Sequence, residues 1–214
     1  KHPVDEPDAS GNIPDPPYLQ GDEDHAKWAM MSYTKTSNEY KLEFSKLDIA
    51  ALQYLYGPST TARTGDDTYY YDGTSANFIW DGGGEDTLSA ANSANPVTIY
   101  LTHGYWGYGG NAKADTITSS GQITVNFGTT IENLTGSDYA DTLTGNDANN
   151  KIYGGYGDDT IYGGAGNDSL DYSFANGNDK LYGGLGNDRY YVYSYSGTDT
   201  FIEYLDEGFD EVIT

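Results

Sequence analysis

A nine-residue repeat in the second half of the sequence constrains the fold more than any other feature. From Gly136 onward the sequence divides into nines, and two consecutive copies, 154–162 and 163–171, fit the pattern Gly-Gly-x-Gly-x-Asp-x-U-x, where U is a large apolar residue. Less regular copies occupy 136–144 and 145–153, and another copy occupies 183–191. Between them, Asp179 and Leu181 keep the sixth and eighth positions if Tyr172 and Ser173 are counted as two extra residues.

This spacing predicts a coil of short parallel strands. Six residues of each copy make a turn and three make a strand, so two copies complete one circuit and residues 18 apart stack on each other. We therefore expect Asp141 to meet Asp159 and Asn150 to meet Asp168. The residues expected to point inward are those at the eighth position, Leu143, Ile152, Ile161, Leu170 and Leu181. The predicted fold class is mainly β, a parallel β-roll related to the right-handed β-helix.

The turns have the composition of a site for a hard cation. Glycine accepts positive φ and lets several carbonyls turn inward, while the sixth-position Asp adds negative charge. An all-oxygen shell of this kind suits Ca²⁺, whereas Mg²⁺ demands near-octahedral geometry and gives up its water reluctantly. We predict calcium ligands in the repeat at Ser137, Tyr139, Asp141, Asn146, Ala148, Asn150, Gly154, Gly155, Tyr156, Gly157, Asp159, Gly163, Gly164, Ala165, Gly166, Asp168, Asp179 and Asp188.

The predicted core is too thin to hold the roll together unaided. One inward residue per repeat gives about 2 kcal/mol of apolar burial, against roughly 1–2 kcal/mol of entropy for each residue that is ordered. Calcium must supply the difference, so we expect the region to be largely unfolded without it. An alternative interpretation treats the Gly, Asn and Asp residues as ordinary hairpin turns of a β-sandwich.

The rest of the chain has a different character. Residues 1–27 contain five prolines and should form a surface loop. Apolar residues at three- and four-residue spacing predict one amphipathic helix over about 46–56, which Gly57 and Pro58 end. Beyond it, strand-like segments alternate with Gly and Asp turns and predict a β-sandwich-like flank beside the roll; they include 68–71, 78–80, 97–101 and 123–127. We place the domain boundary between 56 and 57.

Charge and composition exclude several classes of function. The sequence has 33 acidic and 10 basic residues, a formal net charge of −23, which disfavours binding to nucleic acid or to an anionic membrane. It contains no Cys, so no disulfide stabilises it, while 22 Tyr argue against disorder. No apolar run approaches the ~20 residues needed to cross a bilayer. The N-terminal residues lack the pattern of a cleavable signal, so we expect a soluble chain that is exported by another route.

Together these segments resemble the C-terminal half of the serralysin-type metalloproteases. The resemblance rests on the nonapeptides and on three upstream stretches, 47–57, 63–68 and 80–88. It implies calcium sites outside the regular repeat at Arg63, Gly65, Asp67, Asp81, Gly83, Gly84, Asp86, Thr130 and Glu132. The family usually has Thr where Asp67 stands.

The same resemblance gives the N-terminal residues a meaning. The family's zinc helix ends in His-Glu-x-x-His-x-x-Gly-x-x-His-Pro, and residues 1–3 are similar to its last residues, which implies His2 as a zinc ligand. Residues 30–33 are similar to the Met-turn, with Met31 beneath the metal and Tyr33 able to reach it. The domain 1–56 would then be a loop-plus-helix remnant of a metzincin catalytic domain. A catalytic zinc needs three protein ligands, so without the His-Glu-x-x-His segment we expect no zinc and no peptidase activity in this chain.

Two functions from different classes remain open. The first is a bacterial secreted zinc metalloendopeptidase whose roll folds on calcium outside the cell and supports export. Its partners would be calcium ions, a protein or peptide substrate and a type I secretion apparatus. The second is a non-enzymatic surface protein, such as an adhesin or a surface-layer scaffold. A carbohydrate-binding groove near Trp80, Tyr105, Trp106 and Tyr108 is a weaker third hypothesis, since Tyr is common in strands for its own sake.

Overall fold

The computed structural model divides into two compact units, residues 1–51 and 52–214. The residues described are 51–52, 54–57, 59, 61–74, 76–110, 113–117, 119–171, 176–192 and 197–214. The predicted loop over 1–27, the first part of the predicted helix, and His2, Met31 and Tyr33 lie outside them. Residues 51, 52 and 54–56 are helical, and the helix ends before Gly57, which has a φ of 82°.

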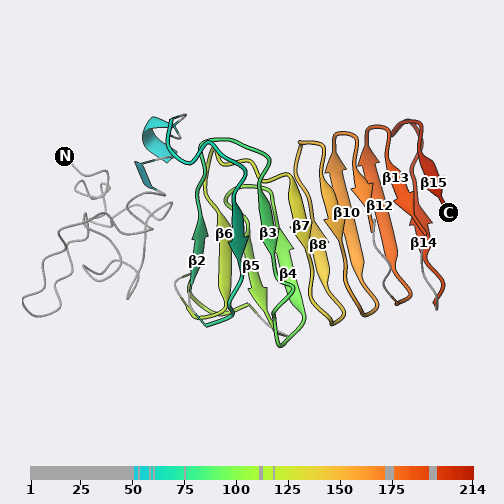
Figure 1. Ribbon diagram of the computed structural model, residues 1–214, viewed down its shortest axis with the longest axis horizontal. Helices are drawn as coiled ribbons and strands as arrows, with labels where there is room; N and C mark the ends of the chain where they lie inside the picture. The colour runs from blue at the N-terminus through green and yellow to red at the C-terminus, as the bar shows by residue number, and fades with distance from the viewer. Residues whose placement is uncertain are drawn as a thin grey trace, which may run out of the picture. The chain divides into compact units, whose positions relative to one another are not determined.

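The unit 52–214 is built from short strands in two sheets (Figure 1). The seven-stranded sheet has the order β1-β3-β7-β9-β11-β13-β15, and all of its pairs are parallel. Its strands are β1 (Thr68–Tyr70), β3 (Thr87–Ser89), β7 (Asn133–Thr135), β9 (Lys151–Tyr153), β11 (Ser169–Leu170), β13 (Arg189–Tyr191) and β15 (Glu211–Ile213).

The second sheet has eight strands in the order β14-β12-β10-β8-β4-β5-β6-β2. They are β2 (Asn77–Ile79), β4 (Val97–Tyr100), β5 (Trp106–Gly109), β6 (Gln122–Val125), β8 (Thr142–Thr144), β10 (Thr160–Ala165), β12 (Lys180–Leu185) and β14 (Thr200–Ile202). From β8 to β15 the chain alternates between the two sheets, which is the predicted parallel β-roll. The predicted strand segments at 68–71, 78–80, 97–101 and 123–127 correspond to β1, β2, β4 and β6.

The flank departs from the regular coil within the same two sheets. β5 pairs antiparallel with both β4 and β6, and β6 then pairs parallel with β2. Gly107 in β5 makes this meander possible, because a Cβ at that position would lie 2.5 Å from the carbonyl oxygen of Thr98 in β4. The region predicted to be sandwich-like therefore continues the two sheets of the roll, through the β4–β8 pair in one sheet and the β3–β7 pair in the other.

In the roll, the core between the two sheets is formed by one inward side chain from each strand, whereas flank strands such as β2 and β6 bury several residues each. All five residues predicted to point inward have no exposed surface, and Tyr190, at the eighth position of its own repeat, is 1% exposed. Their neighbours along each strand are more exposed, as in the alternating pattern of β8. Because one residue per strand is fully buried, each coil contributes little apolar burial of its own.

The stacking interval lengthens along the roll. The amide of Asp141 donates to Asp159, 18 residues away, as predicted, and the amide of Asp159 donates to Asp179, 20 residues away. Farther on, the amide of Asp188 donates to Asp210, 22 residues away. The two extra residues predicted near Tyr172 are confirmed by the change from 18 to 20, and the coils after Tyr190 are longer again.

Loss of one inward side chain should be costly when calcium is saturating. We expect Leu170→Ala, which leaves a cavity in a core with one inward residue per strand, to lower the free energy of unfolding by about 2–5 kcal/mol. Leu185→Ala is the matched control because Leu185 is 59% exposed, and it should cost less than about 0.5 kcal/mol. Urea unfolding followed by circular dichroism measures both, and equal effects would contradict a core formed by the eighth positions.

Candidate metal centre

The sixth-position carboxylates form two ladders that run along the roll. On one side the Oδ1 of Asp159 accepts the amide of Asp141 at 2.8 Å, and the Oδ1 of Asp179 accepts the amide of Asp159 at 2.8 Å. On the other side the Oδ1 of Asp168 accepts the amide of Asn150 at 2.7 Å, and the series continues through Asp188. The predicted stacking of Asp141 on Asp159 and of Asn150 on Asp168 is confirmed. Each carboxylate thus joins its own coil to the preceding one.

The second oxygen of these carboxylates has no protein partner. The Oδ2 atoms of Asp159, Asp168 and Asp188 are buried and accept no hydrogen bond. These three residues are 1–2% exposed, and a buried acceptor without a donor costs roughly 1–3 kcal/mol, more when it is charged. All three belong to repeats that begin with Gly-Gly. The unpaired oxygens indicate that a cation is the missing partner.

The first glycine of each Gly-Gly pair makes room for this oxygen. A Cβ at Gly154 would lie 2.2 Å from the Oδ2 of Asp159, and one at Gly163 would lie 2.3 Å from the Oδ2 of Asp168. The second glycine, such as Gly155 with a φ of 105°, packs its Cα against the carbonyl of Ser137 one coil earlier. Only glycine fits both positions, because the first demands close approach and the second demands close approach together with a positive φ. Carbonyl and carboxylate oxygens are therefore brought together without side chains between them, as a calcium shell requires.

The two less regular repeats satisfy their sixth residue differently. Asp141 accepts the Ser137 amide at 2.5 Å and the Ser137 hydroxyl at 2.9 Å. Asn150 accepts the Asn146 amide at 2.8 Å and donates to the carbonyl of Glu132 at 3.1 Å. In these two repeats, where another residue replaces the second glycine, the side-chain oxygens of Asp141 and Asn150 accept hydrogen bonds from protein donors. The ligands predicted at 137–150 are placed at the turn but remain a prediction.

Burial and mutual repulsion act on the ladder carboxylates. Loss of hydration raises the pKa of Asp159 to about 9, and the negative charges of Asp141, Asp179 and Asp171 add to this rise. Desolvation also raises the pKa of Asp168 to about 7 and that of Asp179 to about 6. A bound dication would reverse these shifts, because an adjacent opposite charge favours the ionised form.

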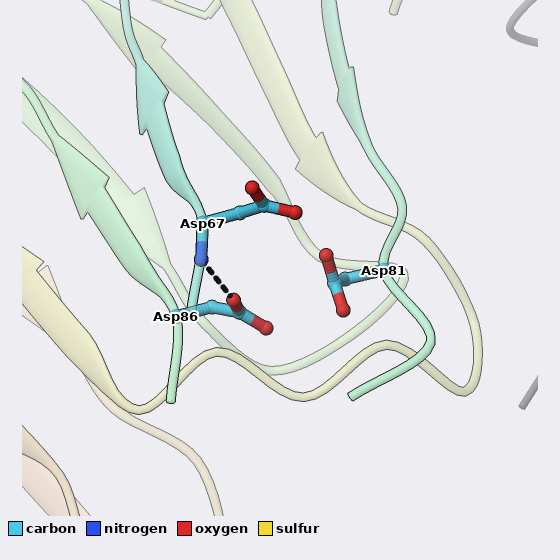
Figure 2. Close-up of side chains that lie close together, drawn as sticks. All are labelled: Asp67, Asp81 and Asp86. Atoms are coloured by element: carbon cyan, nitrogen blue, oxygen red, sulfur yellow. Dashed lines mark hydrogen bonds between the residues drawn. The ribbon is translucent and has the colours of Figure 1, made fainter. Parts of the chain in front are cut away.

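A separate cluster lies in the flank, where the resemblance implied calcium ligands. The carboxylates of Asp67, Asp81 and Asp86 project toward one another from neighbouring turns, with ligand atoms within 4.8 Å (Figure 2). Asp86 is fully buried, its Oδ1 accepts the Asp67 amide at 2.8 Å, and its Oδ2 has no partner. Desolvation raises the pKa of Asp86 to about 6. A cation also fits here, which supports Asp67 as a ligand although the family usually has Thr.

The backbone around this cluster is shaped for close approach. A Cβ at Gly84 would lie 2.3 Å from the carbonyl oxygen of Gly65. Gly83 donates its amide to the Oδ1 of Asp81 at 2.7 Å, and Arg63 has a φ of 50° with its guanidinium 4.4 Å from the ring of Trp80. The implied positions Arg63, Gly65, Gly83 and Gly84 are thus neighbours of the three carboxylates. Whether they bind calcium remains a prediction.

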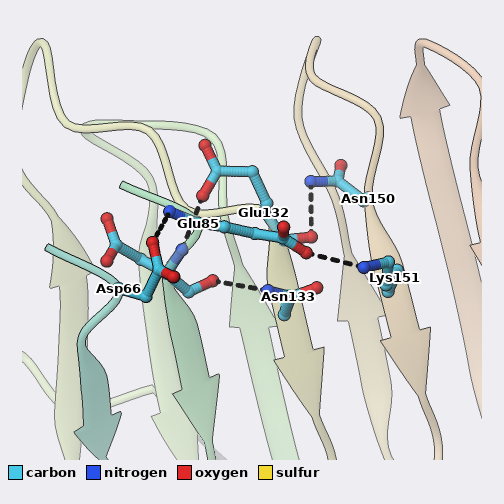
Figure 3. A network of polar contacts seen from close by, with 7 residues as sticks. Asp66, Glu85, Glu132, Asn133, Asn150 and Lys151 are labelled. Atoms are coloured by element: carbon cyan, nitrogen blue, oxygen red, sulfur yellow. Dashed lines mark hydrogen bonds and ion pairs between the residues drawn. The ribbon is translucent and has the colours of Figure 1, made fainter. Parts of the chain in front are cut away.

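Glu132 connects this cluster to the first repeat. Its Oε2 accepts the Asp86 amide at 2.8 Å, and its carbonyl accepts the Asn150 side chain at 3.1 Å (Figure 3). Lys151 forms an ion pair with Glu85 at 2.6 Å across the same network. Thr130 is exposed, whereas Thr129 is buried and its hydroxyl accepts the Asp81 amide at 3.0 Å. Thr129 is thus a positioning residue that the sequence analysis missed.

An outer ladder at the fifth position was also missed. The Oδ1 of Asn149 accepts the Asn167 amide at 2.7 Å, and the Oδ1 of Asn167 accepts the Asn187 amide at 2.8 Å. On the opposite side the Oδ1 of Asp158 accepts the Asn178 amide at 2.8 Å. The signal was present in the sequence, since Asp or Asn occupies the fifth position in most copies. Two further acidic clusters were not predicted as groups, Asp171 with Asp179 and Asp199, and Asp188 with Glu203 and Asp210.

Comparisons with known proteins agree with this geometry. A family model described as the RTX calcium-binding nonapeptide repeat (4 copies) matches residues 135–170 and 175–201. Serralysin from Proteus mirabilis is 34% identical over 158 residues, which cover 63% of this chain and 30% of that protein. Serralysin B from Dickeya chrysanthemi is 32% identical over 140 residues, which cover 56% and 28%. The chain therefore spans about three tenths of the length of these relatives.

The repeat match over 135–170 and 175–201 and the two-sheet coil of the described residues there define the class, an RTX calcium-binding β-roll. Three serralysins are 32–34% identical to the chain over aligned stretches of 140–158 residues, so this part of the chain is similar to the serralysins. No helix among the described residues is long and apolar enough to cross a membrane.

The raised pKa values predict an unusual pH dependence in the absence of calcium. The folded chain holds protons on Asp159, Asp168 and Asp179 more tightly than the unfolded chain, whose Asp pKa is near the ordinary 3.8. The resulting stabilisation is fully present below about pH 4 and is lost as the pH rises through about 6 to 9. In excess chelator, circular dichroism should show more β-structure at pH 5 than at pH 8.

Two comparisons test whether the buried ladder carboxylates cause this pH effect. Asp159→Asn should weaken it, whereas Asp158→Asn should not, because Asp158 is exposed and its pKa is lowered by the Asn178 amide. With saturating calcium the trend should reverse, since protons compete with the metal. A chelated chain that is more structured at pH 8 than at pH 5 would refute this prediction.

Substitution of a first-position glycine should disturb the turn directly. Gly154→Ala would place a methyl group 2.2 Å from the Oδ2 of Asp159, so we expect weaker calcium binding and a loss of about 1–3 kcal/mol in stability. Lys180→Ala is the control, because Lys180 is exposed on β12 and is not among the predicted calcium ligands. Calcium titration followed by thermal unfolding measures calcium affinity and stability in both variants. A Gly154→Ala variant with unchanged affinity and stability would contradict the requirement for glycine beside the Oδ2 of Asp159.

Proposed function

We propose that the roll is a calcium-dependent folding module of a serralysin-like protein that acts outside the bacterial cell. The observation that carries this proposal is the set of buried, unpartnered carboxylate oxygens on Asp159, Asp168 and Asp188, each beside a glycine that leaves it room. Without a cation these oxygens oppose folding. With one they join successive coils.

Calcium affinity would decide where the chain folds. Extracellular calcium modules bind at about 10⁻⁴ to 10⁻³ M, so a module in this range stays unfolded in the cytosol and folds outside. The thin apolar core supports this dependence, because each strand of the roll buries one inward residue. An unfolded polyanion is also a suitable cargo for a narrow type I export channel. The roll would then act as a folding switch for secretion and as a stabilising module afterwards.

We propose zinc endopeptidase activity only for a longer protein that contains this chain together with a zinc-binding His-Glu-x-x-His segment. The relatives are serralysins, and Serralysin from Proteus mirabilis supports a protease parent at 34% identity. The sequence contains three His and no His-Glu-x-x-His segment. We propose that His2 and Tyr33 contribute to a zinc site, with Met31 below it, when that segment is supplied. Bound zinc would activate a water molecule and polarise the peptide carbonyl.

Calcium removal is the direct test of the folding module. In excess chelator at neutral pH we expect the far-ultraviolet circular dichroism of a disordered chain, and millimolar calcium should restore the β signal. Asp168→Asn should raise the calcium concentration at the midpoint by about tenfold, because a charged ligand in a site is worth on the order of 1–3 kcal/mol. Asp147→Asn, at an exposed position, should leave the midpoint unchanged. A strong β signal in chelator at neutral pH would exclude a calcium-dependent fold.

A further inference from the structure

Asp171 departs from the repeat in position and conformation. It occupies the ninth place of its copy, where the preceding copies have Thr144, Tyr153 and Tyr162. Its φ is 53°, a left-handed conformation that Asp tolerates better than most residues. It lies directly after β11, where the match to the nonapeptide family stops, at residue 170, before resuming at 175. The coil that it begins is the first one in which the stacking interval rises to 20.

The side chain of Asp171 is buried without full compensation. It is 5% exposed, and its Oδ1 has no hydrogen-bond partner. The Gly154 amide hydrogen-bonds to the carboxylate, which leaves one oxygen unsatisfied. The charges that act on it most strongly are those of Asp179 and Asp199, both negative. A buried carboxylate facing two others needs a cation or protons to be stable.

Asp179 and Asp199 complete a cluster with Asp171. Ligand atoms of the three carboxylates lie within 4.8 Å of one another. Asp179 is 3% exposed and Asp199 is partly buried. Their mutual arrangement is held by the backbone, because the Asp179 amide donates to the Oδ1 of Asp199 at 3.1 Å and the Thr200 amide donates to the carbonyl of Asp179 at 2.7 Å. The cluster therefore spans two successive coils.

We propose that Asp171, Asp179 and Asp199 form a divalent-cation site, with Ca²⁺ as its ion, outside the nonapeptide pattern. The turn before Asp179 has no Gly-Gly pair, so it lacks the glycines that bring carbonyl oxygens together in the regular turns. The Asp171 carboxylate supplies an oxygen in their place. Three carboxylates give the site a charge of about −3, and a larger ligand charge favours tighter calcium binding. This inference rests on the proposed calcium-binding function.

The number of bound calcium ions tests the site. Equilibrium dialysis of the full chain with radioactive calcium should show that Asp171→Asn binds one ion fewer than the unsubstituted chain. Asn also accepts a positive φ, so the backbone at this position should be retained. Asp147→Asn, which removes an exposed carboxylate within a regular repeat, should bind the full number. An unchanged count in Asp171→Asn would overturn the proposal.

A second variant and a measurement of folding separate loss of the site from loss of the fold. Asp199→Asn changes the most exposed of the three ligands and should also remove one ion, while near-ultraviolet circular dichroism in saturating calcium reports a folded chain for each variant. If both variants are folded and bind the full number, the site does not exist. If the unsubstituted chain itself binds no calcium, the proposed function fails instead, so the two failures are distinguishable.

Discussion

The structure depends on carboxylates that are buried at most turns of the regular coil. Each sixth-position Asp uses one oxygen to accept a backbone amide from the preceding coil, as Asp159 does from Asp141. The other oxygen is left without a donor in the regular repeats. The alignment of the coils and the burial of charge are therefore coupled: the hydrogen bond that aligns two coils also buries a carboxylate that needs a cation or a proton to be stable. The chain has a net charge of −23, and each strand of its roll buries one inward residue, so apolar burial offsets little of this repulsion in the roll.

Departures from the repeat show how this coupling is adjusted. Where Ser137 replaces the second glycine, its hydroxyl donates a hydrogen bond to the sixth-position Asp141. Where Asn146 replaces it, the Asn146 backbone amide donates to the sixth-position Asn150. These turns therefore have fewer unpaired oxygens. Where the coil gains two residues, a carboxylate from the strand end, Asp171, enters the turn. The flank uses a third arrangement, in which Asp86 is aligned by Glu132 from a distant segment. The same physical requirement, oxygen ligands around a buried position, is met by different residues in each case.

Much of the fold could be predicted because the repeat is short and strictly spaced. The eighth positions are buried, and the sixth positions stack at 18 residues and shift to 20 after the two extra residues near Tyr172. The flank was predicted less completely. Its strands were identified, but the antiparallel pairing of β5 with β4 and β6 was not, because short Tyr-rich strands carry no signal for their partners. The fifth-position ladder through Asn167 was overlooked although its signal was present.

The sequence by itself determined the coil, its period, the inward residues and the chemistry of the turns, because each of these follows from a local pattern repeated along the chain. The tertiary structure alone decided which oxygens remain unpaired and which carboxylates meet across coils of unequal length. Asp171 and Asp199 are far apart in the sequence, at unrelated places in their repeats, yet their carboxylates share one cluster. The reason is geometric: a longer coil rotates its residues out of the nine-residue register, and only the stacked backbone shows where they come to lie.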